Sequence, residues 1–319
     1  MTDSVSGAGA DTGTRERVLL LVAIGVTVLS WASAFVVIRG VGPSFGGVPL
    51  ALGRLLIGVV ALAVPLMLTR RWVRPTAREW LLLAVYGGGW FGLYNVALNL
   101  AEQVLDAGTT SLLVNVSPIL LAVGAALVFR EGVHRRLAIG LAVAFAGVVL
   151  IGVANGARLD LGVGVLWCLV AAVAYVVGVL AQKPVLRRLP GTQVTFLGCA
   201  VGAAACLPAA PQLVAELAVA PPAAIAGVVW LGLVPTALAF STWSYSLTRM
   251  PAAQLGVTTY IVPPLVILSA LVALQEFPAP LAIAGGAVCL VGVAISRRRT
   301  ASAGPVPSSL QSDLARVRK

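Results

Sequence analysis

A block of sequence near the middle of the chain recurs 145 residues later, and this repeat constrains the fold more than any other feature. In each copy an apolar segment contains a proline near its start and ends on a glutamate, and a second apolar segment with two spaced glycines follows. Because these spacings are kept without a gap, we interpret the chain as an internal duplication. The matching pairs are Pro118 and Pro263, Leu120 and Leu265, Glu131 and Glu276, Gly140 and Gly285, and Gly147 and Gly292.

The composition places this duplicated chain in a membrane. Of its 319 residues, 59% are hydrophobic and 10% are charged, and the mean hydropathy is +1.00. Soluble domains carry about 25% charged residues, so a chain this apolar cannot hide its surface from water by folding alone. The four cysteines fall inside apolar segments and show no disulfide or metal-ligand spacing. The sequence therefore predicts an integral membrane protein and implies no metal or cofactor.

Ten apolar spans of about 20 residues, the length that crosses a hydrocarbon core, predict an all-α polytopic protein. Five spans fall in residues 18–153 and five in residues 162–296, while residues 1–17 and 297–319 are predicted to be disordered tails. The predicted spans are 18–38, 49–69, 80–101, 107–129, 136–153, 162–182, 192–210, 222–246, 251–274 and 279–296.

The net charge of +11 reflects topology rather than a nucleic-acid partner. Nineteen of the 22 basic residues lie in the tails or in the loops that follow even-numbered spans. Because cytoplasmic loops carry the excess of Lys and Arg, both termini are predicted to be cytoplasmic, in a multi-pass protein of the plasma membrane.

An odd number of spans in each half means that the two halves enter the bilayer in opposite directions. Inverted repeats of this kind are typical of secondary transporters, with the solute site near the midplane between the halves. The predicted fold is thus ten transmembrane helices in two inverted five-helix repeats that work by alternating access.

Several motifs, in order along both halves, resemble the EamA family of the drug/metabolite transporter superfamily. They are Trp31–Phe35 followed by Arg39, Arg54 in the second span, Ser117-Pro118, Val262-Pro263-Pro264, and the glutamates of Phe129–Glu131 and Leu274–Glu276, each followed by spaced glycines. Ala32 stands where that family usually has glycine. The resemblance covers nearly all of residues 19–296 and implies a ten-helix carrier that exports metabolites, amino acids or drugs, without choosing among them.

Polar and aromatic residues inside the spans are candidates for the solute cavity, because such residues in lipid tend to face a cavity or another helix. In carriers that this chain resembles, the spans that hold them help to line the central cavity. An aromatic cavity suits amphipathic or cationic solutes through cation–π attraction. The open alternatives are interhelical hydrogen bonds for the amides and plain packing for the rings. The candidates are Trp31, Tyr94, Asn95, Asn115, Tyr175, Trp243 and Tyr260.

Prolines and glycines inside the spans suggest where helices break or approach closely. Pro118, Pro263 and Pro264 remove backbone donors, so we expect kinks that serve as hinges, although kinks without a function are frequent in membrane helices. Residues 88–92 and 198–202 each have G-x-x-x-G spacing, which lets helix backbones come close together.

Three charged residues are candidates for a gate or for ion coupling. Glu131 and Glu276 end equivalent helices on opposite faces of the membrane, and each is a member of a gate pair, an anchor in reach of water, or a site for a coupling proton. Arg54 lies near the start of the second span, where snorkelling to the headgroups and pairing with an acidic substrate are the two interpretations.

These features favour a secondary carrier that exports a small organic solute. A passive channel is the alternative, but the sequence shows no selectivity-filter repeat or charged pore ring. A membrane-embedded enzyme is less favoured, because one histidine and scattered aspartates offer no catalytic constellation. The predicted partners are thus a small-molecule solute and the lipid bilayer, and a coupling proton stays open.

Overall fold

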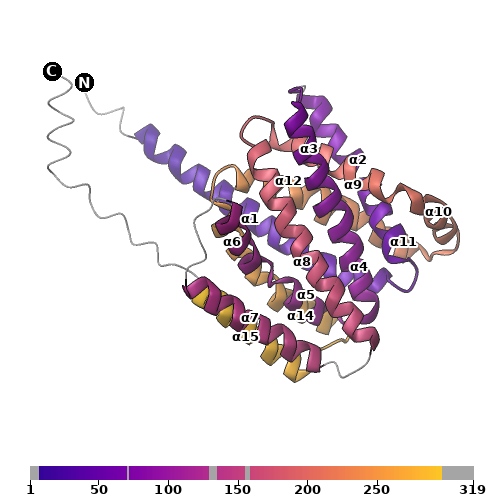
Figure 1. The fold of residues 1–319 in the computed structure, drawn as a ribbon. Helices are drawn as coiled ribbons and strands as arrows, with labels where there is room; N and C mark the ends of the chain where they lie inside the picture. The colour runs from indigo at the N-terminus through magenta and orange to yellow at the C-terminus, as the bar shows by residue number, and fades with distance from the viewer. Residues whose placement is uncertain (1–6, 70–71, 129–134, 155–158, 297–319) are drawn as a thin grey trace, which may run out of the picture.

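The computed structural model of the chain describes residues 7–69, 72–128, 135–154 and 159–296. These residues form helices and no strands (Figure 1). Eight helical segments are long and apolar enough to cross a membrane, and two shorter apolar ones cover Ala138–Ile151 and Pro280–Gly292. An all-helical membrane protein is therefore confirmed, while the count of ten spans stays a prediction.

The elements follow the predicted spans closely. In the first half they are α1 (Gly7–Val41), α2 (Gly47–Thr69), α3 (Ala77–Tyr86), the π-helix η1 (Gly87–Leu93), α4 (Tyr94–Val104), α5 (Ala107–Val114), α6 (Ser117–Val128) and α7 (Arg135–Ala154). In the second half they are α8 (Leu159–Val185), α9 (Gly191–Cys206), η2 (Leu207–Ala209), α10 (Ala210–Val219), α11 (Pro222–Leu231), the π-helix η3 (Gly232–Leu238), α12 (Ala239–Leu247), α13 (Ala252–Thr258), η4 (Thr259–Ile261), α14 (Val262–Ala273) and α15 (Pro280–Ser296).

The structure differs from the sequence prediction at the N-terminus. Helix α1 begins at Gly7, so residues 7–17, which were predicted to be disordered, continue the first apolar span as helix (Figure 1). Alanine, arginine and glutamate in this stretch have good helix propensity, and helix extension onto a formed span needs no new nucleus. The predicted C-terminal tail lies outside the described residues.

The duplication appears in the backbone as two π-helical segments. Both are seven residues long, both begin at a glycine, and their first residues, Gly87 and Gly232, are 145 apart, which is the offset of the sequence repeat. Segment η1 packs on α9, and η3 packs on α2. Since π-helical turns occur frequently at functional sites, these two segments mark a region of interest that sequence patterns did not reveal.

Two spans are interrupted at matching places. The fourth span breaks between α5 and α6, and the ninth passes from α13 through the short η4 into α14. Pro118 and Pro263 are the second residues of α6 and α14. There the missing N–H would have no partner anyway, so proline is tolerated in the first turn. The prolines therefore begin new half-helices instead of kinking continuous ones.

Helices α7 and α15 pack antiparallel along one flank of the bundle (Figure 1). A side chain on Gly147 would place its Cβ 2.5 Å from the Gly285 carbonyl oxygen, and one on Gly292 would lie 2.5 Å from that of Gly140. The spaced glycines of the two repeats thus meet each other and let the backbones come into direct contact.

The predicted G-x-x-x-G segments also face each other. A Cβ on Gly87 would lie 2.5 Å from the Gly198 carbonyl oxygen, and one on Gly202 would lie 2.5 Å from Cβ of Phe91. Close helix approach is therefore shown for Gly198 and Gly202 of the second predicted segment, whereas in the first segment Gly92 is in ordinary contact and Gly88 has open space around it, and Gly87 lies one residue before that segment.

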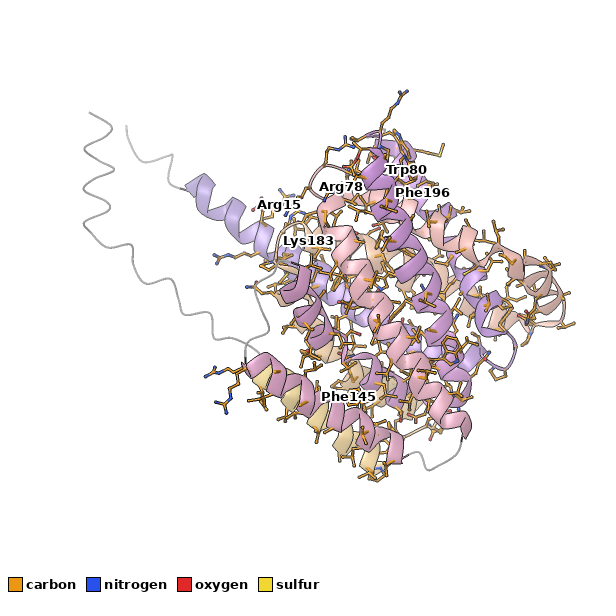
Figure 2. All side chains as sticks on the ribbon, viewed as in Figure 1. Arg15, Arg78, Trp80, Phe145, Lys183 and Phe196 are labelled. Atoms are coloured by element: carbon orange, nitrogen blue, oxygen red, sulfur yellow. The ribbon has the colours of Figure 1, made fainter. Side chains whose placement is uncertain are left out.

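The outer surface is apolar along the helices. Phe145 on α7 is 56% exposed and Trp80 on α3 is 45% exposed, and both point away from the bundle (Figure 2). Exposed large aromatic and aliphatic side chains on many helices would be unusual in water and are expected against lipid. The interior contains a continuous core that extends from α1 to α15.

Candidate substrate cavity

A cavity of about 50 Å³ lies inside the bundle, lined by both halves of the chain. Helices α1, α2 and α4, η1, and the break between α5 and α6 contribute its wall from the first half. Helices α8 and α12, η4 and the start of α14 contribute from the second half. Both spans that contain a π-helical segment and both interrupted spans therefore contribute residues to the cavity wall. Broken helices at the interface of the two repeats are where a solute site is expected in such folds.

Aromatic rings form one continuous side of this cavity. The ring of Trp90 lies 4.9 Å from those of both Tyr175 and Phe240, and Trp31 lies 5.7 Å from Phe240, between ring centroids. All three pairs are edge-to-face, the arrangement that aromatic quadrupoles favour. Glycine makes room for the cluster, because a Cβ on Gly178 would lie 2.5 Å from Cβ of Trp90.

The structure brings most of the predicted cavity residues together. Five of the seven line the cavity: Trp31, Tyr94, Asn95, Asn115 and Tyr175. Trp243 is fully buried behind them, with its ring 5.0 Å from Trp31, and supports the wall instead of lining it. Tyr260 does not line the cavity, where its neighbour Thr259 takes the place.

The buried asparagines bond mainly to backbone carbonyls. Asn95 donates to the Phe91 carbonyl at 2.8 Å, within the π-helical span, and Asn115 donates to that of Ser111 at 3.2 Å. Asn99 is buried and donates across to the Gly47 carbonyl at 2.9 Å, so it does not depend on water at the span's end. The Asn115 side-chain oxygen has no hydrogen-bond partner among the described residues and remains a free acceptor in the cavity wall.

Arg54 is the charged residue of the cavity. It is 2% exposed, so the snorkelling interpretation is wrong: the side chain turns into the bundle, where it lines the cavity. Its Nε donates to Thr236 Oγ1 at 3.2 Å, and that hydroxyl donates to the Leu231 carbonyl at 2.7 Å, inside the widened turns of η3. Its Nη1 has no hydrogen-bond partner in the described part of the chain. An oriented, buried guanidinium with a free N–H is a receptor for an anionic group.

A second charged cluster lies where α1 and α4 end. Arg39 Nε donates to Glu276 Oε1 at 2.9 Å, and Arg39 Nη1 donates to the backbone carbonyl of Glu102 at 2.8 Å. Glu276 follows Gln275, whose φ of 56° lies in the left-handed region. The predicted gate residue Glu276 therefore joins α1 to the segment between α14 and α15, whereas Glu131 lies outside the described residues.

Glu102 is a residue that the sequence analysis missed. The predicted third span ends at residue 101, one residue before Glu102, but α4 continues to Val104 and the side chain is 2% exposed. The available signal was the polar and acidic pair 102–103 just before Val104-Leu105, which shows that apolar sequence resumes beyond it.

The hinge candidates are placed differently from one another. Pro118 lines the cavity at the start of α6, and Pro263 is buried in the first turn of α14. Pro264 is exposed on the outside of α14 and lies away from the cavity wall.

Comparison with known proteins identifies this architecture. The sequence pattern of the EamA-like transporter family matches residues 18–153 and again residues 162–298. The chain belongs to the EamA-like transporter family. The predicted resemblance is thereby confirmed, and this EamA protein is a multi-pass membrane transporter and not an enzyme.

Individual relatives agree with this assignment along nearly their whole length. The chain is 38% identical over 282 residues to a Streptantibioticus cattleyicolor protein named "Probable terminal-alkyne amino-acid exporter", covering 87% of this chain and 93% of that one. It is 28% identical to the "Uncharacterized transporter YdfC" of Bacillus subtilis, covering 88% and 91%. A solved crystal structure, 21% identical, superposes with a TM-score of 0.58 over 88% of this chain and 96% of the other, which supports the fold alone.

Proposed function

We propose that this EamA protein exports a small amino acid or a similar carboxylate-bearing solute from the cytoplasm, by alternating access between two inverted five-helix repeats. The observation that carries the proposal is Arg54, a buried guanidinium with a free N–H in the wall of an aromatic cavity. The name of the Streptantibioticus relative, an amino-acid exporter, points to the same class of solute.

The cavity offers separate surfaces to the parts of an amino acid. The solute's carboxylate binds to Arg54 through charge-assisted hydrogen bonds. The rings of Trp90 and Tyr175 face the solute's apolar side chain and attract its ammonium group through cation–π contact. The free oxygen of Asn115 accepts a hydrogen bond from the ammonium group.

The repeat geometry supports alternating access. The two π-helical segments lie 145 residues apart, η1 contacts α9 from the other half, and η3 contacts α2. The interrupted spans begin their second half-helices at Ser117 and Val262, again 145 apart. Such pseudo-symmetric halves have two similar packings, one open to each face, and the half-helix joints at Pro118 and Pro263 are the proposed hinges. By the positive-inside rule both termini face the cytoplasm of the plasma membrane.

Entrance counterflow in proteoliposomes tests the proposal. Vesicles loaded with an unlabelled amino acid are diluted into the labelled compound, in pools that cover different side chains. A carrier accumulates label transiently above equilibrium, whereas a passive channel lets label enter only to equilibrium. Each amino acid is then tested as a competitor against its decarboxylated amine, which keeps the side chain and the ammonium group. We expect the amino acid to compete and the amine to fail.

The matched variants are Arg54→Gln and Arg249→Gln. Arg249 is exposed and stacks 3.5 Å above the Tyr245 ring, outside the cavity. Removing one partner of a buried charge pair costs about 2 kcal/mol or more, so Arg54→Gln raises the half-saturating concentration by roughly 30-fold or more. Arg249→Gln keeps wild-type values. Equal competition by the amine, or equal kinetics of the two variants, would reject Arg54 as the carboxylate site.

A further inference from the structure

Glu102 stands apart from the other acidic residues at its end of the bundle. Asp106 caps α5 through hydrogen bonds with Thr109, and Glu216 accepts the Gly46 N–H at 3.1 Å. Glu276 pairs with Arg39, as described above. Neither carboxyl oxygen of Glu102 has a hydrogen-bond partner among the described residues, although the side chain is 2% exposed.

The carboxyl group of Glu102 lies between the cavity and the ion pair. It is in electrostatic range of Arg54, which lines the cavity, and of Arg39, which holds Glu276. The other titratable groups in electrostatic range of it are Asp106, Glu276, the buried thiol of Cys168 on α8 and the hydroxyl of Tyr94 on α4. The unpaired carboxyl group of Glu102 thus lies among two cationic and two acidic side chains. They are Arg39 of α1, Arg54 of α2, Asp106 before α5 and Glu276 after α14.

An isolated ionised carboxylate in an apolar interior is costly, so such a group either gains a partner or loses its charge by binding a proton. Arg39 already directs one N–H to the backbone carbonyl of Glu102, at 2.8 Å. Its guanidinium therefore needs only a local movement to exchange the Glu276 carboxylate for that of Glu102.

We propose that Glu102 is a proton-binding site that controls the Arg39–Glu276 ion pair and so couples opening of this end of the transporter to a proton. With a proton on Glu102, Arg39 keeps the ion pair with Glu276 that this structure shows, and this end of the transporter is closed. Without the proton, the Glu102 carboxylate competes for Arg39, and the link between α1 and the α14–α15 segment is released.

The proposal does not depend on the identity of the solute, so it is tested without one. Ala34 is a buried residue of the cavity wall on α1, and Ala34→Cys reports when the cavity becomes accessible. A membrane-impermeant maleimide is applied to right-side-out and inside-out vesicles between about pH 5 and about pH 8. The parent protein, whose four cysteines are all buried, gives the background.

We expect labelling from the Arg39 side to rise with pH, by at most about tenfold per pH unit for a single proton. In the Glu102→Gln variant the side chain stays uncharged, so labelling is low and does not change with pH. Glu216→Gln, which changes an acidic residue that has a partner, follows the wild type. A pH-independent wild type, or a Glu102→Gln variant that keeps the wild-type pH dependence, would overturn the proposal.

Glu276→Gln provides a second test that does not require a change at a buried position, since Glu276 is 28% exposed. Without the ion pair there is nothing for the proton to control, so labelling is high at every pH. Infrared spectroscopy adds a direct readout, because the C=O band of a protonated carboxyl group should be lost in Glu102→Gln and remain in Glu276→Gln. Persistence of pH-dependent labelling in Glu276→Gln would also overturn the proposal.

Discussion

Replacing Gly147 with alanine should destabilise the contact between α7 and α15. The added Cβ would lie 2.5 Å from the Gly285 carbonyl oxygen and 2.7 Å from the Cys289 backbone nitrogen. Both neighbours are backbone atoms that cannot rotate away, so the helices themselves must separate. Gly25 on α1 is the matched control, because a Cβ there meets nothing within 4 Å.

The size of the effect follows from these distances. Ordinary contact begins at 3.4 Å, so the helices must move apart by about 0.9 Å. A gap of that size removes about a quarter to a half of the dispersion energy of each contact that it opens. Overpacking of this kind costs about 1–3 kcal/mol. Alanine in place of glycine in a helix contributes up to about 1 kcal/mol in both variants. Gly147→Ala should therefore be about 1–3 kcal/mol less stable than Gly25→Ala.

Unfolding by SDS in mixed micelles, followed by tryptophan fluorescence, measures the difference in free energy. Gly285→Ala forces the same separation from the other helix, so the Gly147→Ala/Gly285→Ala double variant should lose less than the sum of the single losses, by about 0.5 kcal/mol or more. If Gly147→Ala is as stable as Gly25→Ala, or if the two losses simply add, the direct backbone contact between α7 and α15 is refuted.

Two further predictions concern the cavity. Thr236→Val removes the hydroxyl that accepts a hydrogen bond from Arg54. The half-saturating solute concentration in counterflow should therefore rise by about fivefold, which corresponds to the loss of one hydrogen bond of about 1 kcal/mol. The control variant Thr242→Val should leave this concentration unchanged. In Gly178→Ala the new Cβ would lie 2.5 Å from Cβ of Trp90, so the ring must move. Transport should slow severalfold, while size-exclusion chromatography should show that the protein is still folded. An unchanged transport rate would show that the Trp90 ring does not line the transport path.

The sequence predicted the helices well because their signal is strong and local. Long apolar segments predict the spans, and the proline and glycine spacings predict two halves, which the family pattern matches separately. The glycines at 140, 147, 285 and 292 meet in one seam, which a sequence repeat can suggest but cannot locate. Deviations inside spans were missed, since neither π-helical segment has a sequence signature distinct from that of an ordinary helix with glycine.

The candidate site was predicted only in part, for a physical reason. Hydropathy along the sequence indicates which segments cross the membrane, but not whether an individual side chain turns inward or outward. For Arg54, both directions are compatible with its place near the start of the span, and its inward partner, the Thr236 hydroxyl, lies on a span that is distant in the sequence. Glu102 was lost because a charge near the end of a span lowers the local hydropathy and shortens the predicted span, although the helix buries that charge.

The differences between the halves are more informative about transport than their similarities. Positions that match across the 145-residue offset supply the frame, namely the starts of the π-helical segments, the prolines of the broken spans and the glycines of the α7–α15 seam. Two buried charged positions do not match, although Glu131 and Glu276 do: the counterpart of Arg54 is Cys199, and that of Glu102 is Leu247. A symmetric frame gives two packings of similar energy, which alternating access needs. A charge placed in only one half gives the two packings different electrostatic energies, so a carboxylate-bearing solute or a proton can favour one over the other. In the proposed mechanism, the residues that differ between the halves are thus where a bound ligand favours one packing over the other.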